Sequence, residues 1–144
     1  MKITTKGRYA LRFLLDLAMN QGEGYLSLKE IVERQNFSKK YIEQIIPILN
    51  RSDILLTTRG AKGGYRLAHS ANYYTVAMIL RLTEGGLAPI TCLEQMPNPC
   101  IRCNECETLY VWKGLYKVVS DYLESITLQD IIDNKFKSIN DYVI

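Results

Sequence analysis

Two short helical patterns followed at once by a glycine-rich hairpin, all within residues 27–68, limit this chain to few folds. The segment SLKE places Ser27 three residues before Glu30, the spacing of a capping box at a helix start. Ser38 can cap the second pattern, whose buried stripe is predicted to be Ile42, Ile45, Ile46 and Leu49, with Lys39, Lys40, Glu43 and Gln44 outside. Two short helices joined by a tight turn predict a helix-turn-helix.

The hairpin follows directly. ILLTT at 54–58 and YRLA at 65–68 read as strands, and RGAKGG at 59–64 is the turn between them. Three glycines let the backbone approach a surface closely, and Arg59 and Lys62 supply positive charge at the tip. Alone, such a tip is often a solvated turn. Directly after a helix-turn-helix, it predicts a wing.

A helix is also expected before this unit. From Tyr9 the apolar residues recur with helical period, and GEG at 22–24 ends the pattern. Pro47 lies inside the third predicted helix, where we expect it to bend the helix or to end its regular part early. The base-reading side chains are therefore expected between Ser38 and Gln44.

Composition and charge narrow the class of protein. A chain of 144 residues that is 47% hydrophobic and 23% charged can bury one core. Residues 1–68 carry a net charge of +6 and residues 69–144 a net charge of −3, which suggests that the first part meets a polyanion. A solvated surface with uneven charge is the alternative. With no apolar run of bilayer length and no signal-peptide core, a cytoplasmic protein without a membrane partner is expected.

All four cysteines lie within residues 92–106, in CLEQMPNPCIRCNEC. Cys100, Cys103 and Cys106 have the spacing of the first three ligands in a bacterial ferredoxin run, and Cys92 offers a fourth thiolate. Under reducing conditions such a group indicates metal or redox chemistry rather than disulfides. An iron-sulfur cluster is the first hypothesis, with structural zinc second and uncoordinated redox thiols third.

Three segments carry a family resemblance: TTKGRYAL at 4–11, SKKYIEQ at 38–44 and RGAKGGYRL at 59–67. They resemble the signature blocks of the Rrf-type bacterial transcription regulators, which include the iron-sulfur regulator IscR, the nitric-oxide sensor NsrR and the cysteine-metabolism repressor CymR. The similarity runs along nearly the whole chain. It implies a homodimeric winged helix-turn-helix protein that binds a double-stranded DNA operator, and in several members an iron-sulfur cluster in a loop before a long dimerisation helix.

The fold expected is therefore mainly α, with a small β-hairpin wing and a long dimerisation helix. We divide the chain into a winged helix-turn-helix domain (1–83), a cysteine-bearing loop (84–106), a dimerisation helix (107–124) and a short C-terminal helix and tail (125–144). The helix after Cys106 should cover about four turns. Its predicted dimerisation stripe is Leu109, Trp112, Leu115, Tyr116, Val119, Tyr122 and Leu123. Packing on its own domain is the alternative for this stripe.

The residues expected to contact DNA come from three places. They are Thr5, Lys6, Arg8, Tyr9, Ser38, Lys39, Lys40, Tyr41, Glu43, Gln44, Arg59, Gly60, Lys62, Gly63 and Gly64. In the IscR-like pattern the glutamate of the YIEQ block touches bases, so Glu43 could accept from a cytosine amino group and Gln44 could pair with adenine. The alternative for Glu43 is an intrahelical pair with Lys39 or Lys40.

The cysteine loop departs from the family pattern. Cluster-bearing members usually have three cysteines, which Cys92, Cys100 and Cys106 match, so Cys103 is additional. The IscR group has a histidine where this chain has Leu109, and the NsrR group has an acidic residue where it has Arg8. Cys103 is the obvious replacement, giving an all-thiolate site for a 2Fe-2S or 4Fe-4S cluster. The lone His69 is expected to be a surface residue.

Two functions remain open from the sequence. The first is a regulator, expected to be a repressor, that senses iron-sulfur, redox or nitric-oxide status through the cluster. The second is a CymR-like regulator of cysteine metabolism, controlled by a protein or metabolite, whose cysteines are peripheral. No nucleophile–base pair or nucleotide-binding loop suggests an enzyme. The tail ending in Tyr142, Val143 and Ile144 is expected to pack on the protein, or else to dock in O-acetylserine sulfhydrylase.

Overall fold

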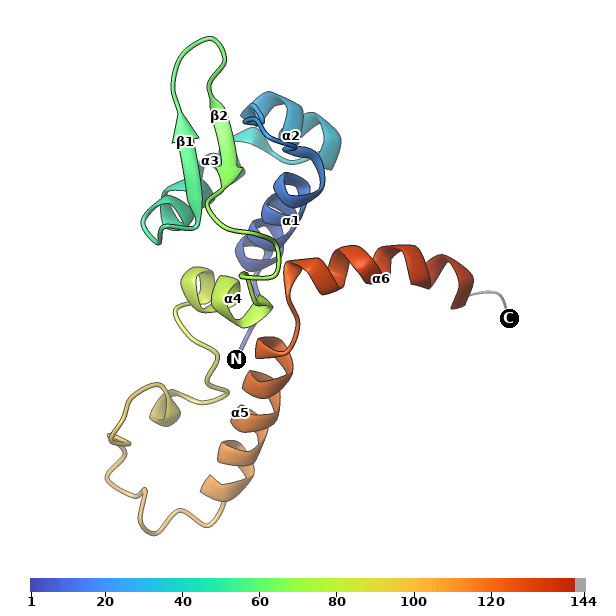
Figure 1. Cartoon of the computed structure of the whole chain (residues 1–144). Coiled ribbons are helices and arrows are strands. Elements are labelled where there is room, and N and C mark those ends of the chain that lie inside the picture. Colours follow the sequence, from blue (N-terminus) through green and yellow to red (C-terminus); the bar gives the residue numbers. More distant parts are fainter. Residues whose placement is uncertain (142–144) are drawn as a thin grey trace.

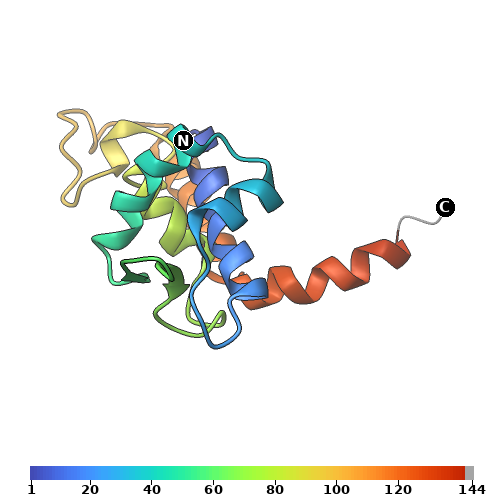
Figure 2. The same ribbon diagram turned by 90° about the horizontal axis from the view of Figure 1, so that it is seen from above.

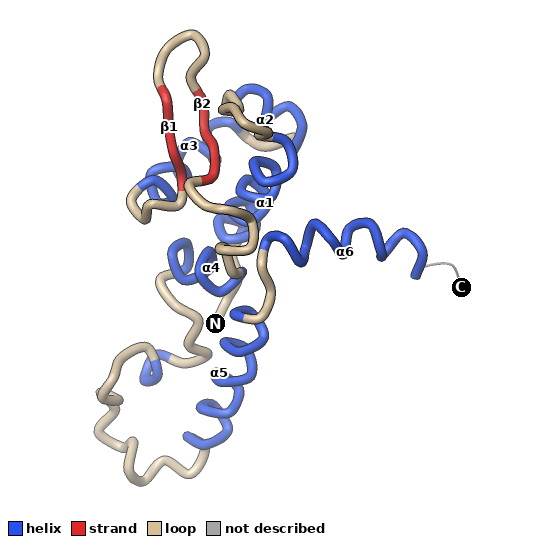
Figure 3. Tube along the Cα trace, viewed as in Figure 1, coloured by secondary structure: helices blue, strands red, loops and turns tan. Residues whose placement is uncertain are grey.

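The computed structural model describes the backbone of residues 1–141 and the side chains of residues 1–134. Helices dominate, and the strands form a single hairpin (Figure 1, Figure 3). In chain order the elements are α1 (Thr5–Asn20), α2 (Leu28–Gln35), α3 (Lys39–Asn50), β1 (Leu55–Thr58), β2 (Gly64–Leu67), α4 (Val76–Glu84), the short 3-10 helix η1 (Thr91–Leu93), α5 (Leu109–Glu124) and α6 (Leu128–Asp141).

The helix-turn-helix predicted from the sequence is confirmed in its details. Ser27 and Glu30 form the capping box of α2, each side chain bonded to the other residue's backbone N–H, at 3.2 and 2.8 Å. Asn36 ends α2 in the left-handed conformation, with a φ of 54°, which Asn adopts more readily than most residues. The predicted stripe of α3, formed by Ile42, Ile45, Ile46 and Leu49, is buried. These helices pack with α1 into one core.

The helix α3 does not end early at Pro47. It continues to Asn50, and the N–H of Arg51 still bonds to the carbonyl of Pro47, at 3.3 Å. The expectation of an early end was wrong because Ile46 and Leu49, on either side of the proline, are buried in the core. This packing outweighs the one hydrogen bond that proline cannot donate.

The predicted hairpin is also confirmed, and a third short segment of the chain pairs with it. The strands β1 and β2 pair antiparallel with Leu55 opposite Leu67 and Thr58 opposite Gly64. Leu26, in the connection before α2, forms a bridge with Tyr65, with N–H to carbonyl distances of 2.9 and 2.8 Å. This third segment, absent from the sequence prediction, fixes the hairpin to the start of α2 and so sets the direction of its tip.

Residues 69–83, for which no element was predicted, contain most of α4. Thr75 caps this helix, its hydroxyl accepting from the N–H of Met78 at 3.1 Å. One face of α4 joins the first core through Ile79. The other face forms a second apolar cluster with residues of α5 and α6, comprising Val76, Ala77, Leu80 and Leu87 as its buried members. The helix α4 therefore connects the winged helix-turn-helix with the C-terminal helices.

The molecule is elongated (Figure 1). The tip of the hairpin and the cysteine-bearing loop lie at opposite ends, with α1, α4 and α5 between them. The helix α6 turns away from α5 and projects from the body in both views (Figure 2). Its first residue, Leu128, is fully buried in the first core. In the part of the chain that is described, no helix is both long and apolar enough to cross a membrane.

Candidate nucleic-acid interface and cysteine loop

The start of α3 presents a row of exposed polar side chains. The hydroxyl of Ser38 accepts from the N–H of Tyr41 at 3.4 Å and so fixes the first turn of the helix. Lys39, Lys40, Glu43 and Gln44 are all exposed there, as predicted. Within residues 1–134 the ion pairs lie elsewhere, so Glu43 is not held by either lysine. Its carboxylate is available to accept a hydrogen bond from a ligand.

Tyr9 and Tyr41, predicted to contact DNA, are half-buried in an aromatic group instead of standing free. The ring of Tyr9 packs on Phe37, with centroids 4.7 Å apart, and edge-on against Tyr41 at 5.3 Å. The guanidinium of Arg12 lies 4.7 Å from the centroid of Phe37. The group joins α1 to the first turn of α3. Any contact of these tyrosines with DNA would use only their exposed edges.

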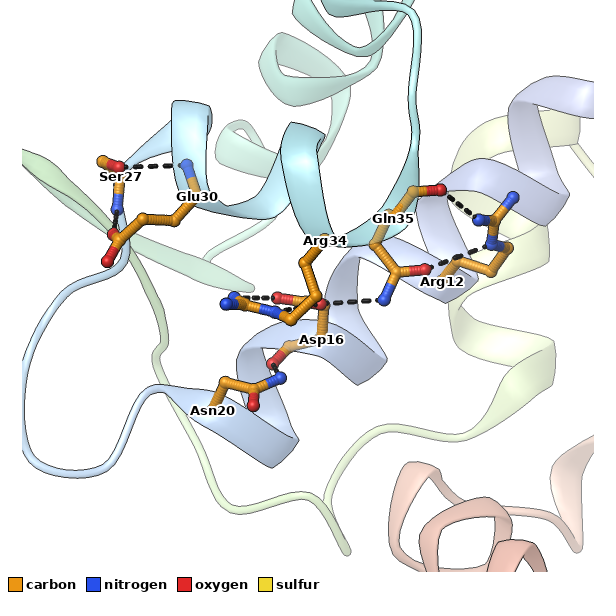
Figure 4. A network of polar contacts seen from close by, with 7 residues as sticks. All are labelled: Arg12, Asp16, Asn20, Ser27, Glu30, Arg34 and Gln35. Atoms are coloured by element: carbon orange, nitrogen blue, oxygen red, sulfur yellow. Dashed lines mark hydrogen bonds and ion pairs between the residues drawn. The ribbon is translucent and has the colours of Figure 1, made fainter.

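A polar network that the sequence analysis missed shares Arg12 with this aromatic group. Figure 4 shows the network. The buried carboxylate of Asp16 accepts from Arg34 at 2.6 and 2.9 Å and from the side-chain amide of Gln35 at 2.8 Å. Arg12 in turn donates to the backbone carbonyl of Gln35 at 2.6 Å. The network ties α1 to the last residues of α2 and thus to the turn that leads into α3. A single aspartate inside an apolar helical pattern was its only signal in the sequence.

The hairpin tip carries exposed positive charge. Arg59, Gly60 and Lys62 are all exposed, and Gly60 has a φ of 103°, which favours glycine. Gly63 is needed for the turn itself, because a Cβ there would lie 2.8 Å from the carbonyl oxygens of Thr58 and Gly60.

Gly64 has a different role from the predicted one. It is buried in β2, and a Cβ on it would lie 2.2 Å from the carbonyl oxygen of Leu26. We therefore correct its assignment, because its backbone faces a neighbouring segment of the same chain. The glycine allows the bridge between Leu26 and Tyr65.

The first turn of α1 supplies the third basic group. Thr5 and Arg8 are exposed and bonded to each other, the guanidinium donating to the hydroxyl at 3.1 Å, and Lys6 is half-buried. Half of the twelve basic residues at positions 1–68 lie in these three places: Lys6, Arg8, Lys39, Lys40, Arg59 and Lys62. No acidic residue lies in the first turn of α1 or α3. The basic side chains on these first turns can attract phosphates.

The four cysteines share one loop but are not gathered into a site in the structure. All four are free thiols, with Cys92 and Cys103 half-buried and Cys100 and Cys106 exposed. Within the described residues no group of three or more metal-ligating side chains is close enough to hold an ion. A turn links Cys100 and Cys103 through a backbone hydrogen bond of 3.1 Å. All four predicted cysteine ligands are thus present as free thiols in the loop, but in this structure they are not close enough together to bind one ion.

Two features of this loop fit a thiolate-bound cluster. Hydrogen bonds from the side chain and backbone of Thr108, at the start of α5, lower the pKa of the Cys106 thiol and favour the thiolate. The side chain of Asn98 accepts from the N–H of Cys100 at 2.9 Å, while its buried amide nitrogen has no partner among the described residues. A buried amide donor without a partner beside a cysteine suits a sulfur acceptor. The residues present therefore fit an iron-sulfur cluster in chemistry.

The helix α5 has two apolar faces. Of the predicted dimerisation stripe, Tyr116 and Leu123 pack against the cluster of α4 residues in the same chain. Leu109, Trp112 and Val119 are half-buried, whereas Leu115 and Tyr122 are 41% and 63% exposed. Val111 and Val118 are exposed beside these two, although the prediction left them out. The exposed face of α5 is therefore Val111, Leu115, Val118 and Tyr122, at helical spacing.

His69 is exposed and stacks on Tyr73, with ring centroids 4.0 Å apart. Its backbone N–H donates to the hydroxyl of the buried Tyr74 at 2.9 Å. This position next to the hairpin agrees with the expectation of a surface residue. The tail predicted to pack or to dock, Tyr142 to Ile144, lies outside the described residues.

Comparisons with known proteins agree on one family for this chain. The family described as "Rrf2: Iron-dependent Transcriptional regulator" matches residues 3–134. The protein rrf2 of Nitratidesulfovibrio vulgaris is 39% identical over 133 residues, which are 92% of this chain and 87% of that protein. The HTH-type transcriptional regulator IscR of Pectobacterium carotovorum is 35% identical over 135 residues, 94% of this chain and 81% of the relative. Neither name describes an enzyme.

Among solved structures, CymR, the global cysteine regulator of B. subtilis, superimposes with a TM-score of 0.75. It is 34% identical, and the match covers 93% of this chain and 98% of CymR. The expectation of a mainly helical winged-helix fold is confirmed.

Proposed function

Because this chain belongs to the Rrf2 family of transcriptional regulators, we propose that it binds a specific duplex DNA sequence as a homodimer and reports iron-sulfur, redox or nitric-oxide status through its cysteine loop. One observation carries the proposal: the four thiols occupy a single loop that runs directly into α5, while the basic residues proposed to contact DNA belong to α1, α3 and the hairpin. Sensing and DNA binding thus use separate parts of one short chain.

DNA is read by the start of α3. Its exposed face enters the major groove, where Glu43 accepts from a cytosine amino group and Gln44 pairs with adenine. Lys39 and Lys40 contact phosphates at the groove edge. Arg59 and Lys62, at the hairpin tip, reach the neighbouring phosphates or the minor groove. The polar network around Asp16 holds α1, α2 and the turn before α3 in fixed relation, so these contacts are positioned before DNA binds.

The exposed face of α5 forms the dimer contact. Val111, Leu115, Val118 and Tyr122 are spaced by four, three and four residues, the repeat by which two helices pack along a shared seam. Another face of the helix, which includes Tyr116 and Leu123, is already occupied by contacts with α4 residues. A twofold axis along this seam presents two winged domains to two half-sites of a near-palindromic operator.

The residues that would hold the cluster are Cys92, Cys100, Cys103 and Cys106. When bound, the cluster supplies a centre that changes charge or ligation with iron supply, oxidants or nitric oxide. Thr108 favours the Cys106 thiolate, and the amide nitrogen of Asn98, which has no partner among the described residues, would donate to a sulfur of the bound cluster. The loop contains few buried residues between η1 and α5, so its path depends on what the thiols bind.

A CymR-like function is the second candidate. It is favoured by the likeness to CymR and by the dispersed arrangement of the thiols in the described chain. In that case a protein or metabolite controls DNA binding and the cysteines are peripheral. The C-terminal tail is then the candidate docking segment for O-acetylserine sulfhydrylase, and a pull-down comparing the full chain with one lacking Val143 and Ile144 tests it.

Anaerobic purification distinguishes the two candidates. A brown protein with iron and acid-labile sulfide, and with charge-transfer absorption in the visible range, supports the cluster sensor. A colourless protein that stays colourless after reconstitution with iron and sulfide, and still binds DNA, supports the second candidate. The operator is obtained in parallel by selecting duplexes from a random library with the purified protein.

A further inference from the structure

The last residue of α4 caps the first turn of α1. One carboxylate oxygen of Glu84 accepts from the backbone N–H and from the hydroxyl of Thr4, both at 2.9 Å, and its other oxygen lies 3.1 Å from the same hydroxyl. Thr4 is the N-cap residue of α1, but its own side chain makes no cap hydrogen bond to the helix, and the first turn contains no acidic residue. Glu84 thus supplies from another helix the negative charge that stabilises a helix N-terminus.

Gly7 is what allows Glu84 to reach this position. Gly7 is buried, and a Cβ built on it would lie 2.3 Å from a carboxylate oxygen of Glu84 and 3.0 Å from Leu80. Any other residue would push the Glu84 side chain away from Thr4. The glycine in the segment TTKGRYAL is therefore required by packing against Glu84. It stands among Thr5, Lys6 and Arg8, which belong to the proposed DNA-binding residues.

Glu84 also stands at the start of the cysteine-bearing segment. It is followed by Gly85 and Gly86, whose φ angles are 79° and 157°, and then by the buried pair Leu87 and Ala88. The carbonyl of Pro89, the next residue, accepts from the amino group of Met1 at 3.1 Å. The first residues of the chain therefore lie against the connection that leads to Cys92, in the middle of the molecule (Figure 1).

We propose that Glu84 is a positioning residue that links the cysteine loop to the DNA-binding turn of α1. A change in the path of residues 87–92 pulls on Gly85 and Gly86, moves the Glu84 carboxylate relative to Thr4 and loosens the turn that holds Lys6 and Arg8. The link is short, since eight positions separate Glu84 from Cys92. The inference rests on the proposed function for its biological meaning, but its physical content can be measured without DNA.

Four variants separate this role from general stabilisation. Glu84→Ala removes the carboxylate, and Glu84→Gln keeps an oxygen acceptor for Thr4 but removes the charge. Gly7→Ala leaves both Thr4 and Glu84 in place but displaces the carboxylate. Arg81→Ala is the matched control, because Arg81 lies on the same helix and its exposed ion pair with Glu124 does not involve α1.

Hydrogen exchange read by mass spectrometry on peptides covering residues 1–12 is the first measurement. It is made on DNA-free protein, with the four thiols either reduced or alkylated with iodoacetamide, so it does not depend on a cluster. In the wild type and Arg81→Ala, we expect protection of these peptides in the reduced form and faster exchange after alkylation. In Glu84→Ala and Gly7→Ala, exchange should already be fast and alkylation should add little. Glu84→Gln should fall between them.

The exchange measurement can overturn the inference in either of two steps, the hold on the turn or its link to the loop. One such result is wild-type protection of residues 1–12 in Glu84→Ala, which would mean that the carboxylate does not hold the turn. The other is a response to alkylation that is absent in the wild type or undiminished in Glu84→Ala, which would mean that the loop and the turn are not linked through this residue.

Duplex binding is the second measurement, by fluorescence anisotropy on a duplex selected by the wild type. Reduced Glu84→Ala should bind about tenfold more weakly than the wild type, the size of effect expected from losing a helix cap, while Arg81→Ala should bind normally. Normal affinity in Glu84→Ala would contradict the positioning role. Failure of the wild type to bind any duplex would count against the proposed function instead and would leave the exchange results standing.

Discussion

Arg34 donates two hydrogen bonds, at 2.6 and 2.9 Å, to the carboxylate of Asp16, whose side chain is fully buried while that of Arg34 is 38% exposed. The two partners therefore differ in what their removal leaves behind. Loss of Asp16 leaves an arginine that can turn to water. Loss of Arg34 leaves a buried carboxylate with the Gln35 amide as its remaining side-chain donor.

We expect Arg34→Met to lower the free energy of unfolding by about 2 to 3 kcal/mol, because a buried charge loses its counter-ion. Asp16→Asn should lower the free energy of unfolding by less, about 1 kcal/mol, since the oxygen of the new amide can still accept from Gln35. Urea denaturation followed by circular dichroism measures both. An equal loss of stability in the two variants would contradict the expected difference between removing Arg34 and removing the Asp16 charge.

DNA binding should depend steeply on salt. If a dimer neutralises six to ten phosphates, the affinity should fall about a thousandfold or more between 50 and 200 mM salt. Arg59→Ala should weaken binding to all duplexes and reduce the slope, whereas Glu43→Ala should change the preferred sequence more than the affinity. Anisotropy titrations at several salt concentrations test this. Tight binding that is independent of salt would exclude the basic face described above.

The exposed face of α5 should determine the oligomeric state. Leu115→Glu places a charge in the middle of the proposed seam and should produce a monomer, because a carboxylate buried between two apolar helices has no partner there. Lys113→Glu, an exposed position of the same helix, is the control and should leave the dimer intact. Sedimentation velocity distinguishes the two species. A dimeric Leu115→Glu variant would place the interface elsewhere.

Each of Cys92→Ala, Cys100→Ala and Cys106→Ala should abolish cluster assembly, because each removes one of the proposed thiolate ligands. Cys103→Ala is the decisive variant. Loss of iron and sulfide there would establish an all-thiolate site. A cluster retained at full occupancy would show that a residue other than cysteine is the fourth ligand. Iron and sulfide analysis after anaerobic reconstitution measures both.

Ionisation of Tyr74 should lower the stability of the folded protein at alkaline pH. Its hydroxyl donates to the carbonyl of Ile54 at 2.8 Å, and burial raises the pKa of Tyr74 above its ordinary value of 10.0. A raised pKa in the folded state means that its contribution to stability is complete below about pH 10 and is lost as the pH rises through the folded-state pKa.

The variant Tyr74→Phe isolates this effect. Near neutral pH it should be less stable than the wild type by about 1 to 2 kcal/mol, because two backbone groups lose a partner. Above pH 10 the difference should shrink, since phenylalanine does not ionise. Urea denaturation from pH 7 to 11 measures it. A constant difference over this range would contradict the assignment.

Local patterns in the sequence were enough to predict the winged helix-turn-helix. The capping box of Ser27 and Glu30, the buried stripe of α3 and the glycine-rich turn after Thr58 depend on residues that are near neighbours in the chain. Their structure follows from local hydrogen bonds and from the period of apolar residues. The clustering of the cysteines was equally visible, because it is a property of the sequence itself.

Contacts between distant residues were decided only by the tertiary structure. The ion pair of Asp16 and Arg34, the packing of Gly64 against Leu26 and the cap that Glu84 places on Thr4 join segments 18, 38 and 80 positions apart. No local period predicts such pairs, since each depends on where two helices or strands meet after the core has formed. The same reason explains α5: its apolar positions were evident from the sequence, but the packing of α4 determined which of them stay exposed.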